Sequence, residues 1–161
     1  MSVAKPASAN FAFLVVHDRL LDQLGALAER YFAGDPSTSL VKLRQFGEVL
    51  AKRTAAQAGL YGAQESQARL LDRLRDRGLL TPDIADLFHG LRRAGNAATH
   101  EMVGDHREAL HQLRMAWQLG AWFHRTFGDP AFSPGPFVPP PDPEAESAVL
   151  AAELERLRAA L

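Results

Sequence analysis

Helix-start signals constrain the fold of this chain more than any other feature of its sequence. Three times, an aspartate or threonine stands directly before a proline and opens a stretch with apolar residues at helical spacing: Asp35-Pro36, Thr81-Pro82 and Asp142-Pro143. The side-chain oxygen can accept a hydrogen bond from a free amide of the first helical turn, and proline suits the first helical position because it has no amide hydrogen. The sequence therefore predicts helices that begin at residues 36, 82 and 143.

The remaining sequence continues the helical pattern. We expect further helices over about 11–33, 65–77 and 105–127, and we expect the helices that begin at 36 and 82 to reach about 59 and 100. The apolar stripe expected for the first helix is Leu20, Leu24, Leu27 and Tyr31, and Asp18 could cap the later part of this segment. No segment alternates between apolar and polar residues, as a half-buried strand would. The predicted fold class is all-α, an up-and-down bundle of four to five helices.

The composition changes after residue 130. Residues 131–143 hold most of the prolines, which favour an extended, semi-rigid chain, and Phe132 and Phe137 are expected to hold its first part against the helices. Leucines then recur at the 4-3-4 spacing of a coiled-coil seam: Leu150, Leu154, Leu157 and Leu161. We divide the chain into a flexible N-terminus (1–9), a helical bundle (10–130), a proline-rich connector (131–143) and the start of a heptad helix (144–161). This last helix either pairs with another chain or continues into a longer protein, and we favour the second.

Composition and missing motifs exclude several kinds of site. The net charge of −1 gives no electrostatic case for non-specific nucleic-acid binding, and the absence of cysteine excludes disulfides and thiolate chemistry. Gly104 stands where a His-Glu-x-x-His zinc motif needs its second histidine, and no glycine-rich loop ends in Lys-Ser/Thr, so we expect neither a metal nor ATP or another cofactor. The apolar run at 11–16 is too short to cross a membrane and lacks the flanks of a signal peptide. We therefore expect a cytoplasmic protein with no membrane partner.

The stretch "LRRAGNAATHE" at 91–101 carries most of the candidate functional residues. At about 100° per residue, four polar side chains fall within about 60° of one another on a helix that continues to residue 100. They are His89, Arg93, Asn96 and His100, and small residues lie between them. A histidine can take the proton of a ribose 2′-hydroxyl, an arginine can grip the phosphate, and an asparagine can orient either group. The alternative interpretation is a solvent-facing helix surface, which the spacing alone favours.

Arg93 and His100 together resemble the Arg-x(4–6)-His signature of the HEPN superfamily. These are all-α domains, many of them metal-independent ribonucleases of toxin–antitoxin, CRISPR and anti-phage systems, and they usually dimerise. The longer stretch from "NFAFLVVHD" through "DLFHGLRRAGNAATHE" to "AWFHRTFGDPAF" is similar to a HEPN-like domain at the N-terminus of type I restriction enzyme R subunits and related DEAD/DEAH-type helicases. The proline-rich connector and the heptad helix match the order of segments in those proteins.

This resemblance implies an accessory interaction or regulatory domain of a restriction or helicase-type anti-phage defence protein. Its partners would be a second copy that meets it at the polar stripe, the rest of that protein or complex, and RNA or DNA. The alternative is a metal-independent endoribonuclease with His100 as base, Arg93 as phosphate clamp and Asn96 as orienting group, paired across a dimer. In the ribonuclease motif a polar residue directly follows the arginine, whereas Ala94 stands there in this chain. The accessory role is therefore the one we expect.

Overall fold

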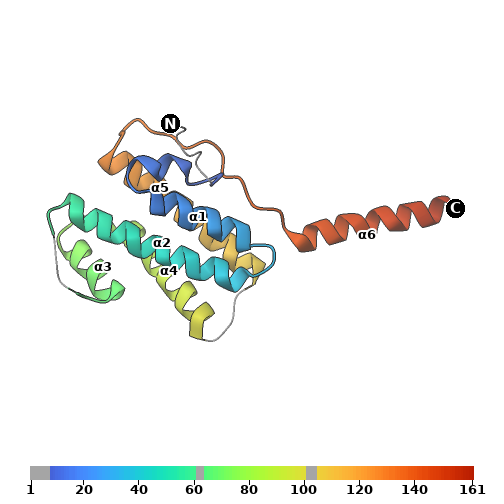
Figure 1. Cartoon of the computed structure of the whole chain (residues 1–161), viewed down its shortest axis with the longest axis horizontal. Helices are drawn as coiled ribbons and strands as arrows, with labels where there is room; N and C mark the ends of the chain where they lie inside the picture. The colour runs from blue at the N-terminus through green and yellow to red at the C-terminus, as the bar shows by residue number, and fades with distance from the viewer. Residues whose placement is uncertain (1–7, 61–63, 101–104) are drawn as a thin grey trace, which may run out of the picture.

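The fold is that of a computed structural model, which describes residues 8–60, 64–100 and 105–161. In these ranges the chain forms one 3-10 helix, η1 (Ala12–Val16), and six α-helices, α1 (Arg19–Tyr31), α2 (Pro36–Gln57), α3 (Gln67–Asp76), α4 (Pro82–His100), α5 (His106–Phe127) and α6 (Pro143–Ala160). The same ranges contain no strand, so the all-α prediction is confirmed. Figure 1 shows α1–α5 gathered in one body, from which α6 projects at one end.

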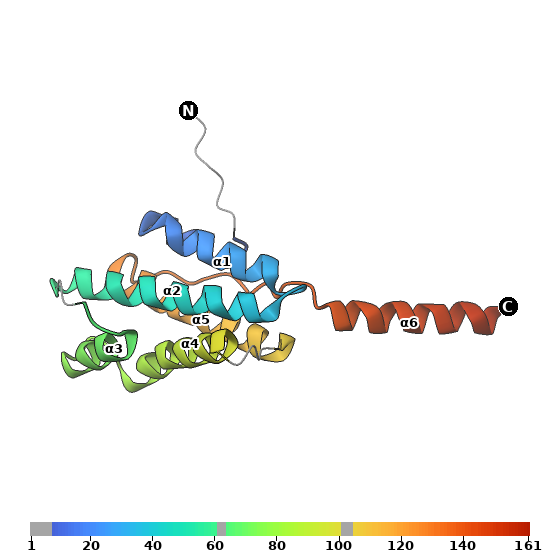
Figure 2. The ribbon, with the colours of Figure 1, turned by 60° about the horizontal axis from the view of Figure 1, so that its bottom comes forward.

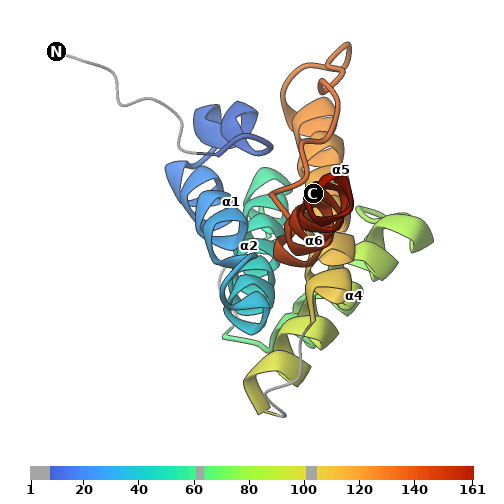
Figure 3. The same cartoon turned by 90° about the vertical axis from the view of Figure 1, so that its right-hand side faces the viewer.

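Helix α2 lies at the centre of this body. It packs against α1 on one side and against α4 and α5 on the other, while the short α3 lies beside α4 (Figure 2). From the end that carries α6, α1 is seen on the side of α2 that faces away from α4 (Figure 3). The largest fully buried side chains are five phenylalanines: Phe11, Phe32, Phe46, Phe88 and Phe123. Because α4 packs against the central helix α2, this contact determines where the polar residues of α4 lie.

The predicted helix starts are confirmed where the side chains are described. The Asp35 carboxylate accepts a hydrogen bond from the Thr38 amide at 3.1 Å, directly before Pro36, the first residue of α2. The Thr81 hydroxyl lies 3.4 Å from the Ile84 amide and accepts its hydrogen bond at the start of α4. These bonds satisfy amides that a helix leaves unpaired at its N-terminus, so helix starts of this kind are encoded locally.

The predicted helix over 11–33 is divided in two, which corrects its apolar stripe. The backbone is extended at Asp18. The Asp18 carboxylate caps α1 by accepting a hydrogen bond from the Leu20 amide at 2.9 Å. The buried face of α1 is formed by Leu21, Leu24 and Ala28, so Leu24 of the expected stripe lies in the core. Leu20 and Tyr31, which we expected in the stripe, are 42% and 41% exposed.

The proline-rich connector is fastened to the helical body before α6 begins. The Asn10 side-chain amide donates to the Val138 carbonyl oxygen at 2.8 Å, and its carbonyl accepts from the Val138 amide at 2.8 Å. The Phe137 ring packs against Trp117 of α5, with 5.6 Å between ring centroids. The expectation that Phe137 holds the connector against the helices is therefore confirmed. Of the predicted flexible N-terminus, residues 1–7 lie outside the described part of the chain, and Ser8 is buried.

A histidine pair joins the end of η1 to α5. Nε2 of His17 and Nδ1 of His124 are 2.8 Å apart, a hydrogen bond in which one ring nitrogen donates and the other accepts. The Phe132 ring packs edge-on against His124, with 4.5 Å between ring centroids, so this phenylalanine also holds the connector as predicted. Burial, and then the positive charges of His124 and Arg53, lower the pKa of His17 below its ordinary value.

We expect the histidine pair to make the free energy of unfolding depend on pH. The pKa of His17 is lower in the folded than in the unfolded chain. Stability is therefore full above the unfolded value of about 6.5 and is lost as the pH falls toward the folded value. His17→Gln cannot take up this proton, so it should flatten the dependence between about pH 7.5 and about pH 5.5, measured by urea unfolding. The exposed His111→Gln serves as control, and an unchanged slope in His17→Gln would contradict the prediction.

Candidate functional site

The polar residues of α4 lie where this helix crosses α2, and a glycine makes the close crossing possible. A Cβ atom added at Gly95 would lie 2.3 Å from Cβ of Arg44 and 3.0 Å from the carbonyl oxygen of Leu40, both on α2. Any larger residue at Gly95 would therefore push the two helices apart. The sequence led us to expect this small residue at an interface with a second copy, whereas the structure uses it inside one chain because α2 fills the space beside it.

Arg44 connects the two helices by polar contacts at the same crossing. Its Nη1 group donates to Oδ1 of Asn96 at 3.2 Å and lies 3.4 Å from the hydroxyl oxygen of Thr99. The Thr99 hydroxyl in turn donates to the carbonyl oxygen of Gly95 at 2.9 Å. Nε of Arg44 is buried without a hydrogen-bond acceptor among the described residues, and the nearest carboxylate oxygen paired with it belongs to Glu48, at 3.5 Å. The side-chain oxygen of Asn96 is therefore already engaged within the fold.

His89 also contacts a neighbouring helix. Its Nε2 lies 3.9 Å from a carboxylate oxygen of Asp72 on α3, and its Nδ1 lies 3.4 Å from Nη2 of Arg92. Burial, and then the charge of Arg92, lower the pKa of His89, while Asp72 acts in the opposite direction. Because the pKa lies below its ordinary value of about 6.5, the neutral form predominates at neutral pH. Its contacts with α3 thus separate His89 from the exposed part of the stripe.

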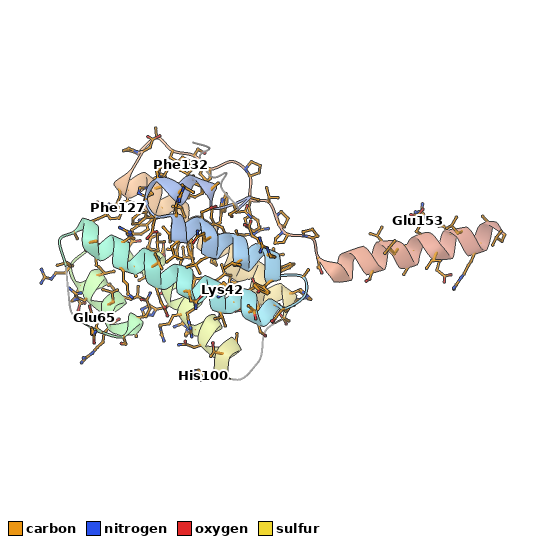
Figure 4. All side chains as sticks on the ribbon, viewed as in Figure 1. Lys42, Glu65, His100, Phe127, Phe132 and Glu153 are labelled. Carbon is orange, nitrogen blue, oxygen red and sulfur yellow. The ribbon has the colours of Figure 1, made fainter. Side chains whose placement is uncertain are left out.

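Arg93 and His100 alone of the four predicted residues are exposed. His100 lies at the last turn of α4, on the outside of the body (Figure 4). Neither side chain makes a hydrogen bond or ion pair with any residue that the structure describes. Two helical turns separate them, a rise of about 10 Å along the helix axis. Arg93 and His100 are thus the two members of the stripe that stay accessible from outside the body.

Three residues of the site were missed by the sequence analysis: Arg44, Glu48 and Thr99. The spacing of Arg44 and Glu48 indicates an ion pair on the surface of one helix, a common arrangement that carries no information about a partner helix. Thr99 lies inside the stretch that we singled out, yet its hydroxyl group did not stand out among the charged neighbours. No local signal links α2 to α4, because the two segments are distant in the sequence.

The ranges that the structure describes contain no group of three histidine, cysteine, aspartate or glutamate side chains placed to hold a metal ion. None of the helices described is long and apolar enough to span a bilayer.

The fold and the site define an all-helical domain whose central helices are joined by an arginine-centred polar contact. The chain belongs to the family described as "Domain of unknown function (DUF4145)", which matches residues 27–118 and so includes the whole α2–α4 crossing. It is 34% identical over 117 residues to the "Type I restriction enzyme EcoKI endonuclease subunit" of Escherichia coli (strain K12). That similarity covers 73% of this chain, and the chain spans about 10% of the length of the subunit. No solved structure matches the chain.

Proposed function

We propose that this chain is an accessory helical domain of a type I restriction or helicase-type defence protein, an interaction or regulatory module of HEPN-like architecture that works in the cytoplasm. The observation that carries this proposal is the extent of the similarity. The similarity to the E. coli endonuclease subunit covers most of this chain but only about a tenth of the length of that subunit. The shared segment is therefore one part of a much larger protein there, and we assign the same kind of part to this chain.

The contacts of the α4 residues support an accessory role over a catalytic one. Asn96 is held by Arg44, and His89 is half-buried beside Asp72, so two of the four candidate residues serve the packing of helices. The bonds between Asn10 and Val138 fasten the connector at a defined point of the body. A domain built in this way can hold neighbouring segments in place, which suits an interaction or regulatory module.

A chimera tests the accessory role. The aligned segment of the E. coli endonuclease subunit is replaced by the matching residues of this chain, and phage restriction is measured by plating efficiency. We expect the chimera to restrict phage, and we expect a subunit with the segment deleted to fail. Gly95→Ala in the chimera should reduce restriction because it separates α2 from α4, whereas Gly90→Ala should not. Normal restriction by the deleted subunit would refute the proposal.

The alternative function is a metal-independent endoribonuclease, and the exposure of both Arg93 and His100 on α4 favours it. Two copies would pair their Arg93 and His100 side chains across a dimer, with the side-chain amide of Asn96 as the orienting group. In the same chimera, His100→Ala separates the two functions. The accessory role predicts that restriction is retained, and the ribonuclease predicts that restriction is lost together with EDTA-resistant RNA cleavage by the purified chain.

A further inference from the structure

Helix α6 presents a row of apolar side chains that nothing in the described structure covers. Leu150, Leu154 and Leu157 are 65%, 53% and 60% exposed, and Leu161 is fully exposed. All side chains from 147 to 161 are exposed, and Figure 4 shows α6 extending away from the helical body. Helices of this length are marginal in water without packing, so an exposed leucine seam indicates a partner helix.

The charges beside the seam identify which partner fits. The leucine spacing places Leu154 at position a and Leu157 at position d of a heptad, so Glu153 falls at g and Arg158 at the following e. In a parallel pair, g of one helix faces e of the next heptad of the other helix. Glu153 of each chain would then face Arg158 of the other, and two-fold symmetry forms this pair twice. In an antiparallel pair, g faces g and e faces e, so Glu153 would not meet Arg158 across the pair.

We propose that α6 pairs in parallel and in register with α6 of a second copy of this chain, burying the leucine seam and joining Glu153 to Arg158 across the pair. In one chain, Glu153 contacts Arg156 at 3.0 Å and Arg158 contacts Glu155 at 3.6 Å. These pairs are exposed, and exposed ion pairs within a helix contribute little, so they do not prevent the exchange of partners.

The attachment of α6 to the body is compatible with a parallel pair. Such a pair places both helical bodies at the same end of the coiled coil. Residues 139–142 separate the fastened Val138 from the first residue of α6. In an extended proline-rich conformation they span about 12 Å, which leaves room for each body to lie to one side of the coiled coil. The exposed Arg93 and His100 take no part in this contact.

Cysteine cross-linking tests the pairing and its direction, because the chain has no cysteine of its own. Ser147→Cys and Leu161→Cys place single thiols at position a near opposite ends of the seam. Parallel pairing brings each thiol next to its own copy, so each variant alone should form a disulfide-linked dimer with oxidised glutathione. Ala152→Cys lies on the outer face at position f and should stay monomeric. Cross-linking only in a mixture of the Ser147→Cys and Leu161→Cys variants would show antiparallel pairing and overturn the proposal.

Charge exchange gives a second, independent measurement. In sedimentation equilibrium of the full chain, Glu153→Lys should weaken dimerisation, and adding Arg158→Glu should restore it. Leu154→Asp should abolish dimerisation while the thermal unfolding of the helical body is unchanged. A wild-type chain that remains monomeric at all concentrations, or a Glu153→Lys variant that dimerises as well as wild type, would overturn the proposal.

Discussion

Replacing Gly95 with alanine is expected to lower the free energy of unfolding by about 2 kcal/mol, the size typical of overpacked cores. In a helix interior, alanine is more favourable than glycine by about 1 kcal/mol. A loss of stability would therefore show that the clash with α2 outweighs this gain. The clash is severe because the Cβ atom of Arg44 and the carbonyl oxygen of Leu40 belong to the rigid part of α2 and cannot rotate away. Moving α2 would also break the hydrogen bond between Arg44 and Asn96.

Gly90→Ala is the matched control on the same helix. A Cβ atom at Gly90 would lie 3.6 Å from Oε1 of Gln112, an ordinary van der Waals contact. We therefore expect Gly90→Ala to raise the free energy of unfolding by about 0.5–1 kcal/mol through helix propensity. Urea unfolding followed by circular dichroism measures both variants. If Gly95→Ala proved as stable as Gly90→Ala, the close crossing of α2 and α4 would be refuted.

Phe11→Ala is expected to lower the free energy of unfolding by about 3–5 kcal/mol, as for other large aromatic residues removed from cores. The Phe11 side chain is fully buried, and its ring lies 5.0 Å from that of Phe46 between centroids. The ring fits because Gly25 faces it, since a Cβ atom there would lie 2.3 Å from Cδ2 of Phe11. The loss combines buried apolar area with the cavity that remains between α1 and α2.

Coupling between Phe11 and Gly25 can be measured by a double-mutant cycle. Gly25→Ala alone should destabilise by about 1–3 kcal/mol, because it displaces the ring. In the Phe11→Ala background it should cost less, since two of the three short contacts, to Cδ2 and Cγ, are removed while the contact to Cβ at 2.9 Å remains. Unfolding by urea gives the four stabilities, and strictly additive effects would contradict direct contact between the two residues.

Much of the fold could be predicted because its signals act over a few residues. The capping of α2 by Asp35 and of α4 by Thr81 involves amides within three positions of the capping residue. For the first segment, Asp18 stood out as a possible cap of the later part, and the structure confirms this cap at the start of α1. In the structure Asp18 is also held by Arg53 of α2, with 2.8 Å between Nη2 and Oδ2, a contact that supports the helix start at this residue.

The helical wheel placed the candidate residues on one face but did not show what covers that face. Arg93 and His100 are exposed, as a stripe pointing away from the core requires. Asn96 and His89, on the same stripe, are engaged by Arg44 of α2 and Asp72 of α3. A wheel describes one helix alone, whereas the neighbour that lies against it depends on how all the helices pack.

Local sequence was sufficient for the all-α class, the capped helix starts, the aromatic residues that hold the connector and the leucine seam of α6. Tertiary structure decided the contacts between distant segments. Arg44 and Asn96 are 52 residues apart, His17 and His124 are 107 apart, and Asn10 and Val138 are 128 apart. Capping and helical periodicity follow from hydrogen bonds and geometry within a few turns of the chain. Which helix crosses Gly95 follows only from packing the whole core, because that packing brings Arg44 within reach of "LRRAGNAATHE".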